Sequence, residues 1–189
     1  LQDFSARVCQ GASATHGALH LSLNEFSDAP EDVQRRILVA ALRWMTGAAY
    51  PPRRGRVANG LMAIRTGRTF TVEGVLLRCR ADRIELIREP AAAKRAAAAR
   101  PDGQGGAIWD GRWQISGLSP EDRVKAVTTA PLSDLHWRAS GLSHDEAAAS
   151  PGVWRDGRLI AAPLLEPDGR FTAIPLRDMV YFRAMIFSH

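Results

Sequence analysis

The strongest structural signal in this chain is an amphipathic segment at residues 27–47, SDAPEDVQRRILVAALRWMTG. Its apolar side chains recur at helical spacing and form one stripe: Val33, Ile37, Ala41 and Trp44 or Met45. Asp28 and Glu31 match a capping box with Pro30 tolerated in the first turn, and Gly47 is a typical residue to end a helix. The segment therefore predicts a helix that packs one face against a core.

A second, shorter helix is predicted after the break at Tyr50-Pro51-Pro52, from about Arg54 to Thr66. Gly67 follows its end, as is common after a helix. The apolar stripe of this helix is formed by Val57, Leu61 and Ile64.

Arginines gather at both ends of this second helix. Arg53, Arg54 and Arg56 lie at its start, and Arg65 and Arg68 lie at its end. Positive groups at a helix N-terminus oppose the macrodipole, so helix stability does not explain the first group. A phosphate placed there would meet both free backbone N–H groups and guanidinium forks. The alternative interpretation is that these side chains are only solvated.

Most of the positive charge lies in one segment. The chain of 189 residues has a net charge of +5 and a pI near 10, but residues 35–100 hold fifteen Arg or Lys against four acidic residues, a net +11. Clustered guanidinium groups favour contact with a polyanion such as a phosphate backbone. Only Lys94 and Lys125 are lysines, so a compositional bias toward arginine remains an alternative explanation.

Strand signals dominate the part of the chain that follows. Short strands are predicted at residues 69–74, 75–81 and 83–89, with a turn at Ala81-Asp82. In the second of these strands Arg78 and Arg80 share one face, opposite an apolar one. Further strands are predicted at residues 108–116, 152–165 and 169–176, and helical pieces at residues 132–137 and 144–150. The apolar end of the chain, residues 179–189, predicts a buried strand.

These elements predict an α+β fold, with a helical N-terminal part followed by a mixed, mainly antiparallel, strand-rich C-terminal domain. We place the domain boundary between residues 1–68 and 69–189. The alanine- and glycine-rich residues 91–106 are the best candidate for an internal linker. The chain starts with Leu rather than Met, which suggests a piece of a longer protein.

No active site can be assembled from the residues, so no catalytic or metal-binding residue is predicted. His16 and His20 have the spacing of one helical turn but lack further ligands. Ser133, Asp134 and His136 are of the right types for nucleophilic catalysis, but adjacent side chains point in different directions. No glycine-rich phosphate-binding loop is present. A self-contained enzyme is therefore the weakest hypothesis.

Cys9 and Cys79 are predicted to be free thiols in a reducing compartment, with a long-range disulfide as the alternative. The chain also contains no apolar run long enough to span a bilayer and no signal-peptide pattern.

Several short motifs follow one another in a distinctive order along the chain. They are Tyr50-Pro51-Pro52-Arg53, Thr71-Val72-Glu73-Gly74-Val75, Arg88-Glu89 and Trp109-Asp110-Gly111-Arg112. In this order they resemble the C-terminal part of bacterial tRNA(Ile)-lysidine synthases, most closely the alphaproteobacterial type. The resemblance covers residues 30–115. Glu73 and Val75 depart from the family's Thr-Leu-Gly-Gly-Cys-like strand, which argues against a catalytic thiol there.

The resemblance implies a parent ligase that uses ATP to adenylate the wobble cytidine of tRNA(Ile), after which lysine displaces AMP. In that family the nucleotide site lies in an N-terminal PP-loop domain with a Ser-Gly-Gly-x-Asp-Ser signature, and no such string occurs in this chain. The resemblance thus implies that ATP and Mg²⁺ belong to a domain outside this chain, which carries no cofactor of its own. It also implies a cytoplasmic protein, and it leaves a homodimer open.

For the chain itself, the resemblance and the charge together predict recognition of the tRNA backbone, with residues 1–68 as a linker and tRNA-recognition domain. The predicted RNA-binding residues are Arg53, Arg54, Arg56, Arg65, Arg68, Arg78 and Arg80. Folded RNA is read largely by shape and backbone, for which arginine forks on a rigid helix are suitable. The competing hypothesis is a protein–protein or structural module whose basic face is solvated.

Overall fold

The computed structural model describes residues 2–187, which separate into two compact units. Unit 1 contains the chain up to Ile87 and from Arg177 onward, and unit 2 contains Arg88–Leu176. These boundaries differ from the predicted division after residue 68, because the strands that follow the second helix complete the sheet of unit 1. Residues 177–187 also belong to unit 1.

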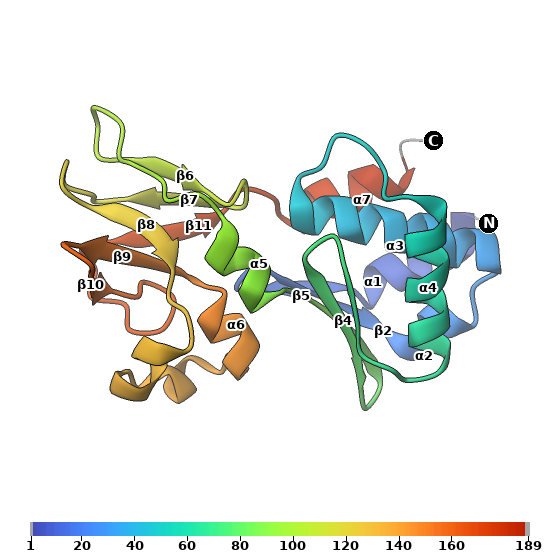
Figure 1. Cartoon of the computed structure of the whole chain (residues 1–189). Helices are drawn as coiled ribbons and strands as arrows, with labels where there is room; N and C mark the ends of the chain where they lie inside the picture. The colour runs from blue at the N-terminus through green and yellow to red at the C-terminus, as the bar shows by residue number, and fades with distance from the viewer. Residues whose placement is uncertain (1, 188–189) are drawn as a thin grey trace. The chain divides into compact units, whose positions relative to one another are not determined.

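Unit 1 combines helices with an antiparallel sheet (Figure 1). The sheet order is β1-β2-β5-β4-β3. β2 pairs antiparallel with β1 and β5, and β3 pairs antiparallel with β4. The elements of this unit are α1 (Gln2–Gln10), β1 (Ser13–Thr15), β2 (Ala18–Ser22), α2 (Leu23–Ser27), α3 (Glu31–Thr46), α4 (Arg54–Arg65), β3 (Phe70–Val72), β4 (Val75–Arg80), β5 (Arg83–Arg88) and α7 (Met179–Phe187).

The core of unit 1 forms where α3 presents its predicted apolar stripe. Its stripe residues are fully or almost fully buried: Val33, Ile37, Ala41, Trp44 and Met45. Gly47 ends α3 in the left-handed conformation at φ 70°, and its N–H donates to the carbonyl of Arg43. The stripe of α4 is buried as well, so both predicted helices are confirmed.

The predicted capping box at the start of α3 is wrong. Asp28 belongs to the end of α2, where its N–H donates to the carbonyl of Asn24 and its backbone is helical. Pro30 is therefore the residue that precedes α3, and no side chain caps that helix. Asp28 cannot cap α3 because its backbone is helical, whereas an N-cap residue requires an extended backbone.

The prediction of a buried strand at residues 179–189 is also wrong over the described part, because α7 is a helix and residues 188–189 lie outside the description. Figure 1 shows α7 beside α3 within unit 1. Phe182 and Ile186, one helical turn apart, are buried, whereas Val180 is 72% exposed. The ring of Phe182 meets Trp44 edge-on at 6.5 Å between centroids. Apolar residues on the exposed side hid this helical period from the pattern.

Unit 2 contains the antiparallel sheets β10-β9-β8 and β11-β7-β6 (Figure 1). Its elements are α5 (Pro90–Arg95), β6 (Ala107–Trp109), β7 (Trp113–Ser116), β8 (Arg123–Ala126), η1 (Ala130–Asp134), η2 (Trp137–Ser140), α6 (His144–Ala148), β9 (Pro151–Arg155), β10 (Arg158–Ala161) and β11 (Thr172–Pro175). With helices and antiparallel sheets in the chain, the α+β fold class is confirmed.

The predicted linker at residues 91–106 is folded within unit 2. α5 buries Ala92 and Ala93, and Ala99 forms a bridge with Val124. Further along, Asp102 accepts hydrogen bonds from the backbone N–H groups of Gly106 and Gln104, and these bonds lower the pKa of its carboxyl. Part of this segment is therefore packed in unit 2: Ala92, Ala93 and Gly106 are buried, while most of the other residues are exposed.

The Arg88-Glu89 and Trp109-Asp110-Gly111-Arg112 motifs meet in unit 2. Arg88 donates two hydrogen bonds to Asp110, at 2.9 Å from Nε and 2.7 Å from Nη2. Asp110 stands in the turn between β6 and β7, its side chain is 5% exposed, and Arg112 lies 3.7 Å from it. These motif residues form an ion-paired corner that holds the β6–β7 hairpin.

Candidate nucleic-acid interface

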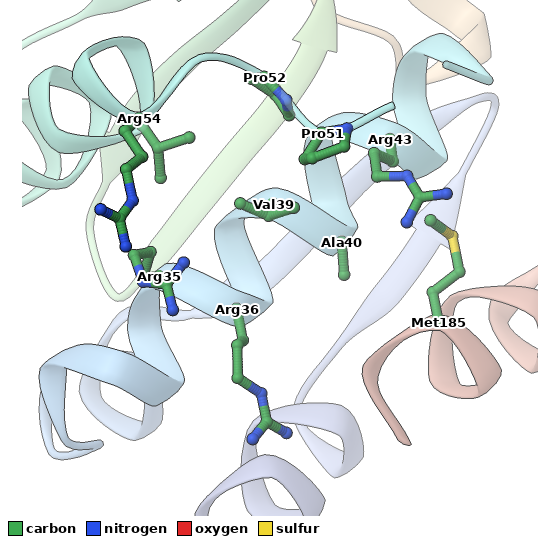
Figure 2. A pocket seen from close by; sticks show the side chains of 10 residues that line it. Arg35, Arg36, Val39, Ala40, Arg43, Pro51, Pro52, Arg54 and Met185 are labelled. Atoms are coloured by element: carbon green, nitrogen blue, oxygen red, sulfur yellow. The ribbon is translucent and has the colours of Figure 1, made fainter. Parts of the chain in front are cut away.

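A groove of about 550 Å³ lies in unit 1, between α3 and the chain that leads into α4 (Figure 2). We call it the basic groove. The arginines that line it are Arg35, Arg36, Arg43 and Arg54. The other lining residues are apolar: Val39, Ala40, Pro51, Pro52, Val57 and Met185. No acidic side chain is among these described lining residues.

The loop between α3 and α4 forms one wall of the basic groove, and a side chain of α3 holds this loop in place. Arg43, in the last turn of α3, donates to the carbonyls of Ala48 and Ala49 at 3.2 and 3.0 Å. Pro51 and Pro52 follow after Tyr50 and restrict the backbone further. The wall is thereby held by backbone stiffness and by a side chain from the neighbouring helix.

Arg36 connects the basic groove to the end of the chain. Its Nη2 donates to the carbonyl of Ile186 in α7 at 3.4 Å. A cation near the last carbonyls of a helix is favourable, because those carbonyls carry partial negative charge. Met185 of α7 lies nearby and contributes apolar surface to the groove. Arg36 and Arg43 therefore have structural partners in the protein.

Arg35 and Arg54 differ from those two arginines. Both are exposed, and within residues 2–187 neither takes part in an ion pair. Glu31 lies one helical turn before Arg35 but pairs with Arg65 at 3.1 Å. Figure 2 shows the side chains of Arg35 and Arg54 extending on the same side of the groove. Two guanidinium groups on one wall without a carboxylate favour an anion from outside.

The start of α4 has the same electrostatic character. Arg53 is the residue before the helix, no side chain caps it, and the first turn contains no acidic residue. Arg53, Arg54 and Arg56 are all exposed there. The first N–H groups of a helix carry partial positive charge. The local backbone and the arginines therefore both favour negative charge at this point.

The remaining predicted arginines lie elsewhere in unit 1. Arg65 and Arg68 stand at the far end of α4, where Arg65 pairs with Glu31. Arg78 of β4 donates to Glu85 of β5 at 2.6 Å, and its side chain is only 11% exposed. Arg80 is 64% exposed and lies 3.9 Å from the same carboxylate. The structure thus places Arg54 in the basic groove and engages Arg78 with the protein's own carboxylate.

Three arginines of the basic groove were not predicted, namely Arg35, Arg36 and Arg43 of α3. A signal for two of them was present in the sequence. Arg35, Val39 and Arg43 follow one another at intervals of four residues, which places them along one side of a helix. That side meets the Pro51-Pro52 wall. The helical pattern places these arginines outside the buried stripe of α3, but it does not by itself assign them to a site.

The described range, residues 2–187, shows no cluster of three or more His, Cys, Asp or Glu arranged to hold a metal ion. It also holds no helix with the length and apolar character needed to cross a membrane. Cys9 and Cys79 are free thiols, as predicted, and burial raises the pKa of each.

The geometry defines an α+β chain with an arginine-rich groove suited to a polyanion. No protein-family profile matches the chain. It is 33% identical over 175 residues to the tRNA(Ile)-lysidine synthase of Ruegeria pomeroyi, covering 92% of this chain and 41% of that protein. It is 34% identical over 143 residues to the enzyme of the same name from Caulobacter vibrioides, covering 74% of this chain and 33% of that protein.

The chain therefore belongs with the tRNA(Ile)-lysidine synthases, as a homologue of part of their length. It spans less than half of each of these relatives, which is consistent with a C-terminal portion. The resemblance carried by the short motifs is thereby confirmed.

Proposed function

We propose that this chain is the tRNA-binding portion of a tRNA(Ile)-lysidine synthase, and that unit 1 holds the tRNA backbone at the basic groove and the start of α4. The observation that carries the proposal is that Arg35, Arg53, Arg54 and Arg56 gather at the basic groove and the start of α4, where all four are exposed and none has a carboxylate partner within residues 2–187. Guanidinium forks match phosphate oxygens in geometry and charge. Arg65, Arg68 and Arg80 extend the positive surface, and Arg78 contributes only if its bond to Glu85 opens.

The proposal for the whole enzyme follows from its relatives. It is a cytoplasmic, ATP-dependent ligase that joins lysine to the wobble cytidine of tRNA(Ile). ATP and Mg²⁺ bind a catalytic domain outside this chain. The chain itself contributes recognition of tRNA(Ile) and no catalytic group.

A protein–protein interaction module is the second candidate, and a specific feature of α7 favours it. Val180 is 72% exposed and Tyr181 is 51% exposed, so the outer side of this helix is apolar. An apolar contact depends little on salt, whereas a phosphate contact weakens steeply as salt rises. The salt dependence of binding therefore separates the two candidates.

Replacing Arg53, Arg54 and Arg56 by alanine in the full enzyme tests the proposal. We expect tRNA binding to weaken, and the slope of log affinity against log salt to flatten by about one for each phosphate that is no longer bound. The matched control replaces Arg100, Arg138 and Arg158, exposed arginines of unit 2, and removes the same charge. Equal losses of affinity in both variants, or unchanged binding across the salt series, would reject the assignment to unit 1.

A further inference from the structure

We propose that the basic groove holds a single unstacked nucleotide of the bound RNA, with its base against the apolar floor and its phosphate between Arg35 and Arg54. This inference rests on the proposed function, because it specifies what the RNA-binding surface recognises. It goes further by assigning a pocket for an unpaired nucleotide to a surface that otherwise needs only backbone contacts.

The apolar floor is the first reason. Contact with a phosphate backbone needs charges and hydrogen-bond donors, but Val39, Ala40, Pro52 and Val57 offer neither. Apolar surface suits the face of a nucleobase that has left its stack, and enzymes that flip out a base hold it between aromatic or apolar side chains. The groove volume of about 550 Å³ also lies within the range of small-ligand sites, roughly 300–1,000 Å³.

The distribution of charge within the groove is the second reason. Arg43 is occupied with the carbonyls of Ala48 and Ala49, and Arg36 with that of Ile186. Arg35 and Arg54 remain, and they extend on one side of the groove (Figure 2). A nucleotide has the same division, with one charged end and one flat apolar body. The two free arginines could therefore hold the phosphate of a nucleotide while its base contacts the apolar lining residues.

The kind of recognition follows from what the lining lacks. Among the described lining residues the arginines are the only side chains with hydrogen-bonding groups that could read the edge of a base; Arg36 and Arg43 bond to backbone carbonyls, and the proposal places Arg35 and Arg54 on the phosphate. Stacking and apolar contact are sequence-tolerant because every base has a flat face. We therefore infer that the groove recognises that a nucleotide is unpaired, and not which base it carries.

Binding of short RNA probes to the full chain tests this inference. The probes are single-stranded five-nucleotide homopolymers of each base and an abasic ribose-phosphate oligomer of equal length. We expect the four homopolymers to bind within about threefold of one another, and the abasic oligomer to bind about tenfold more weakly. Equal binding of the abasic oligomer would overturn the nucleotide pocket.

A groove-filling variant, Val39→Phe, provides a second test, with Val39→Ala as the control that keeps the groove open. We expect Val39→Phe to lower affinity for the homopolymers about tenfold and to leave the abasic oligomer unaffected. The double variant Arg35→Ala with Arg54→Ala should bind both the homopolymers and the abasic oligomer more weakly. A Val39→Phe protein that unfolds like the parent and binds the homopolymers with unchanged affinity would contradict the inference.

A measurement without any variant keeps the test open should Val39→Phe fail to fold. Nuclear Overhauser contacts between uridine H5 or H6 and the methyl groups of Val39 are expected in the complex with the uridine homopolymer. Their absence from an assigned spectrum would contradict the pocket. If base removal has no effect but the Arg53, Arg54 and Arg56 variant still loses tRNA, the nucleotide pocket fails and the proposed function stands. If that variant also binds normally, the proposed function fails as well.

Discussion

The two buried ion pairs of unit 2 hold arginines against carboxylates, whereas the described residues leave the arginines of the basic groove in unit 1 without a carboxylate partner. In unit 2 Arg88 donates two hydrogen bonds to Asp110, and the Nε of Arg155 donates one to the fully buried Asp122 at 2.9 Å, with Nη2 ion-paired to the same carboxylate at 2.8 Å. That bond raises the pKa of Arg155. In unit 1 Arg54 lines the groove without an ion pair among the described residues.

The difference teaches that arginine content alone does not locate a binding surface. An arginine whose carboxylate partner is built into the fold contributes to structure, because separating the pair leaves a charge poorly solvated. An exposed arginine without such a partner can exchange water for phosphate at small cost. Partner geometry therefore separates the two roles: variants of arginines paired with buried carboxylates should mainly change stability, and variants of the exposed arginines at the basic groove should mainly change binding.

The largest expected effect tests how unit 1 is held together. Phe182→Ala removes a fully buried ring that packs on Trp44, and should lower the free energy of unfolding by about 4 kcal/mol. Urea unfolding followed by far-ultraviolet circular dichroism measures it. Val180→Ala, on the exposed side of the same helix, is the control and should change little. Similar effects from both variants would contradict the helical docking of α7.

The second effect tests the ion-paired corner of unit 2. Asp110→Ala leaves Arg88 and Arg112 without their shared carboxylate, and should destabilise unit 2 by about 3 kcal/mol. The fluorescence of Trp109 and Trp113, both buried in unit 2, reports this unfolding in urea. Asp134→Ala, at an exposed site in the same unit, is the matched control. A wild-type urea midpoint for Asp110→Ala would show that the corner contributes little to folding.

The third prediction concerns the affinity for tRNA and not the stability of the fold. Arg35→Ala combined with Arg54→Ala should weaken tRNA binding about tenfold or more, because each charged hydrogen bond to phosphate contributes about 1.5–3 kcal/mol. Filter binding or fluorescence anisotropy at one fixed salt concentration measures it. Arg100→Ala with Arg158→Ala removes the same charge from unit 2 and should reduce affinity far less. Equal losses of affinity in the two double variants would contradict the assignment of tRNA binding to the arginines of unit 1.

The smallest expected effect comes from a single substitution that should raise stability and lower tRNA binding. Arg53→Asp places a capping carboxylate before α4, which has no side-chain cap, and should stabilise the protein by about 0.5–1 kcal/mol. The same change should weaken tRNA binding, because it puts a negative charge beside the phosphates. Thermal unfolding and tRNA affinity are measured on the same sample. A lower melting temperature would show that Arg53 supports the fold, contrary to this account.

The sequence predicted the elements whose signals are local. α3 and α4 carry clear apolar stripes, and the α+β class followed from their order with the strands. α7 was missed because its exposed apolar residues hide the helical period. Arg78 lies on the basic face of its strand, but its partner Glu85 comes from the neighbouring strand β5, and side-chain pairing of that kind depends on how the two strands are aligned. The groove itself joins residues from α3, the proline loop and α7, which only the folded chain brings together.

The most direct test of the central claim is the salt dependence of tRNA binding by the unaltered chain. If the unpaired arginines of unit 1 hold phosphates, log affinity falls linearly with log salt, with a slope of about −0.7 to −0.9 for each phosphate bound. The account predicts at least two bound phosphates, at the basic groove and at the start of α4, and thus a slope steeper than about −1.4. Affinity that stays constant across the salt series would contradict the account.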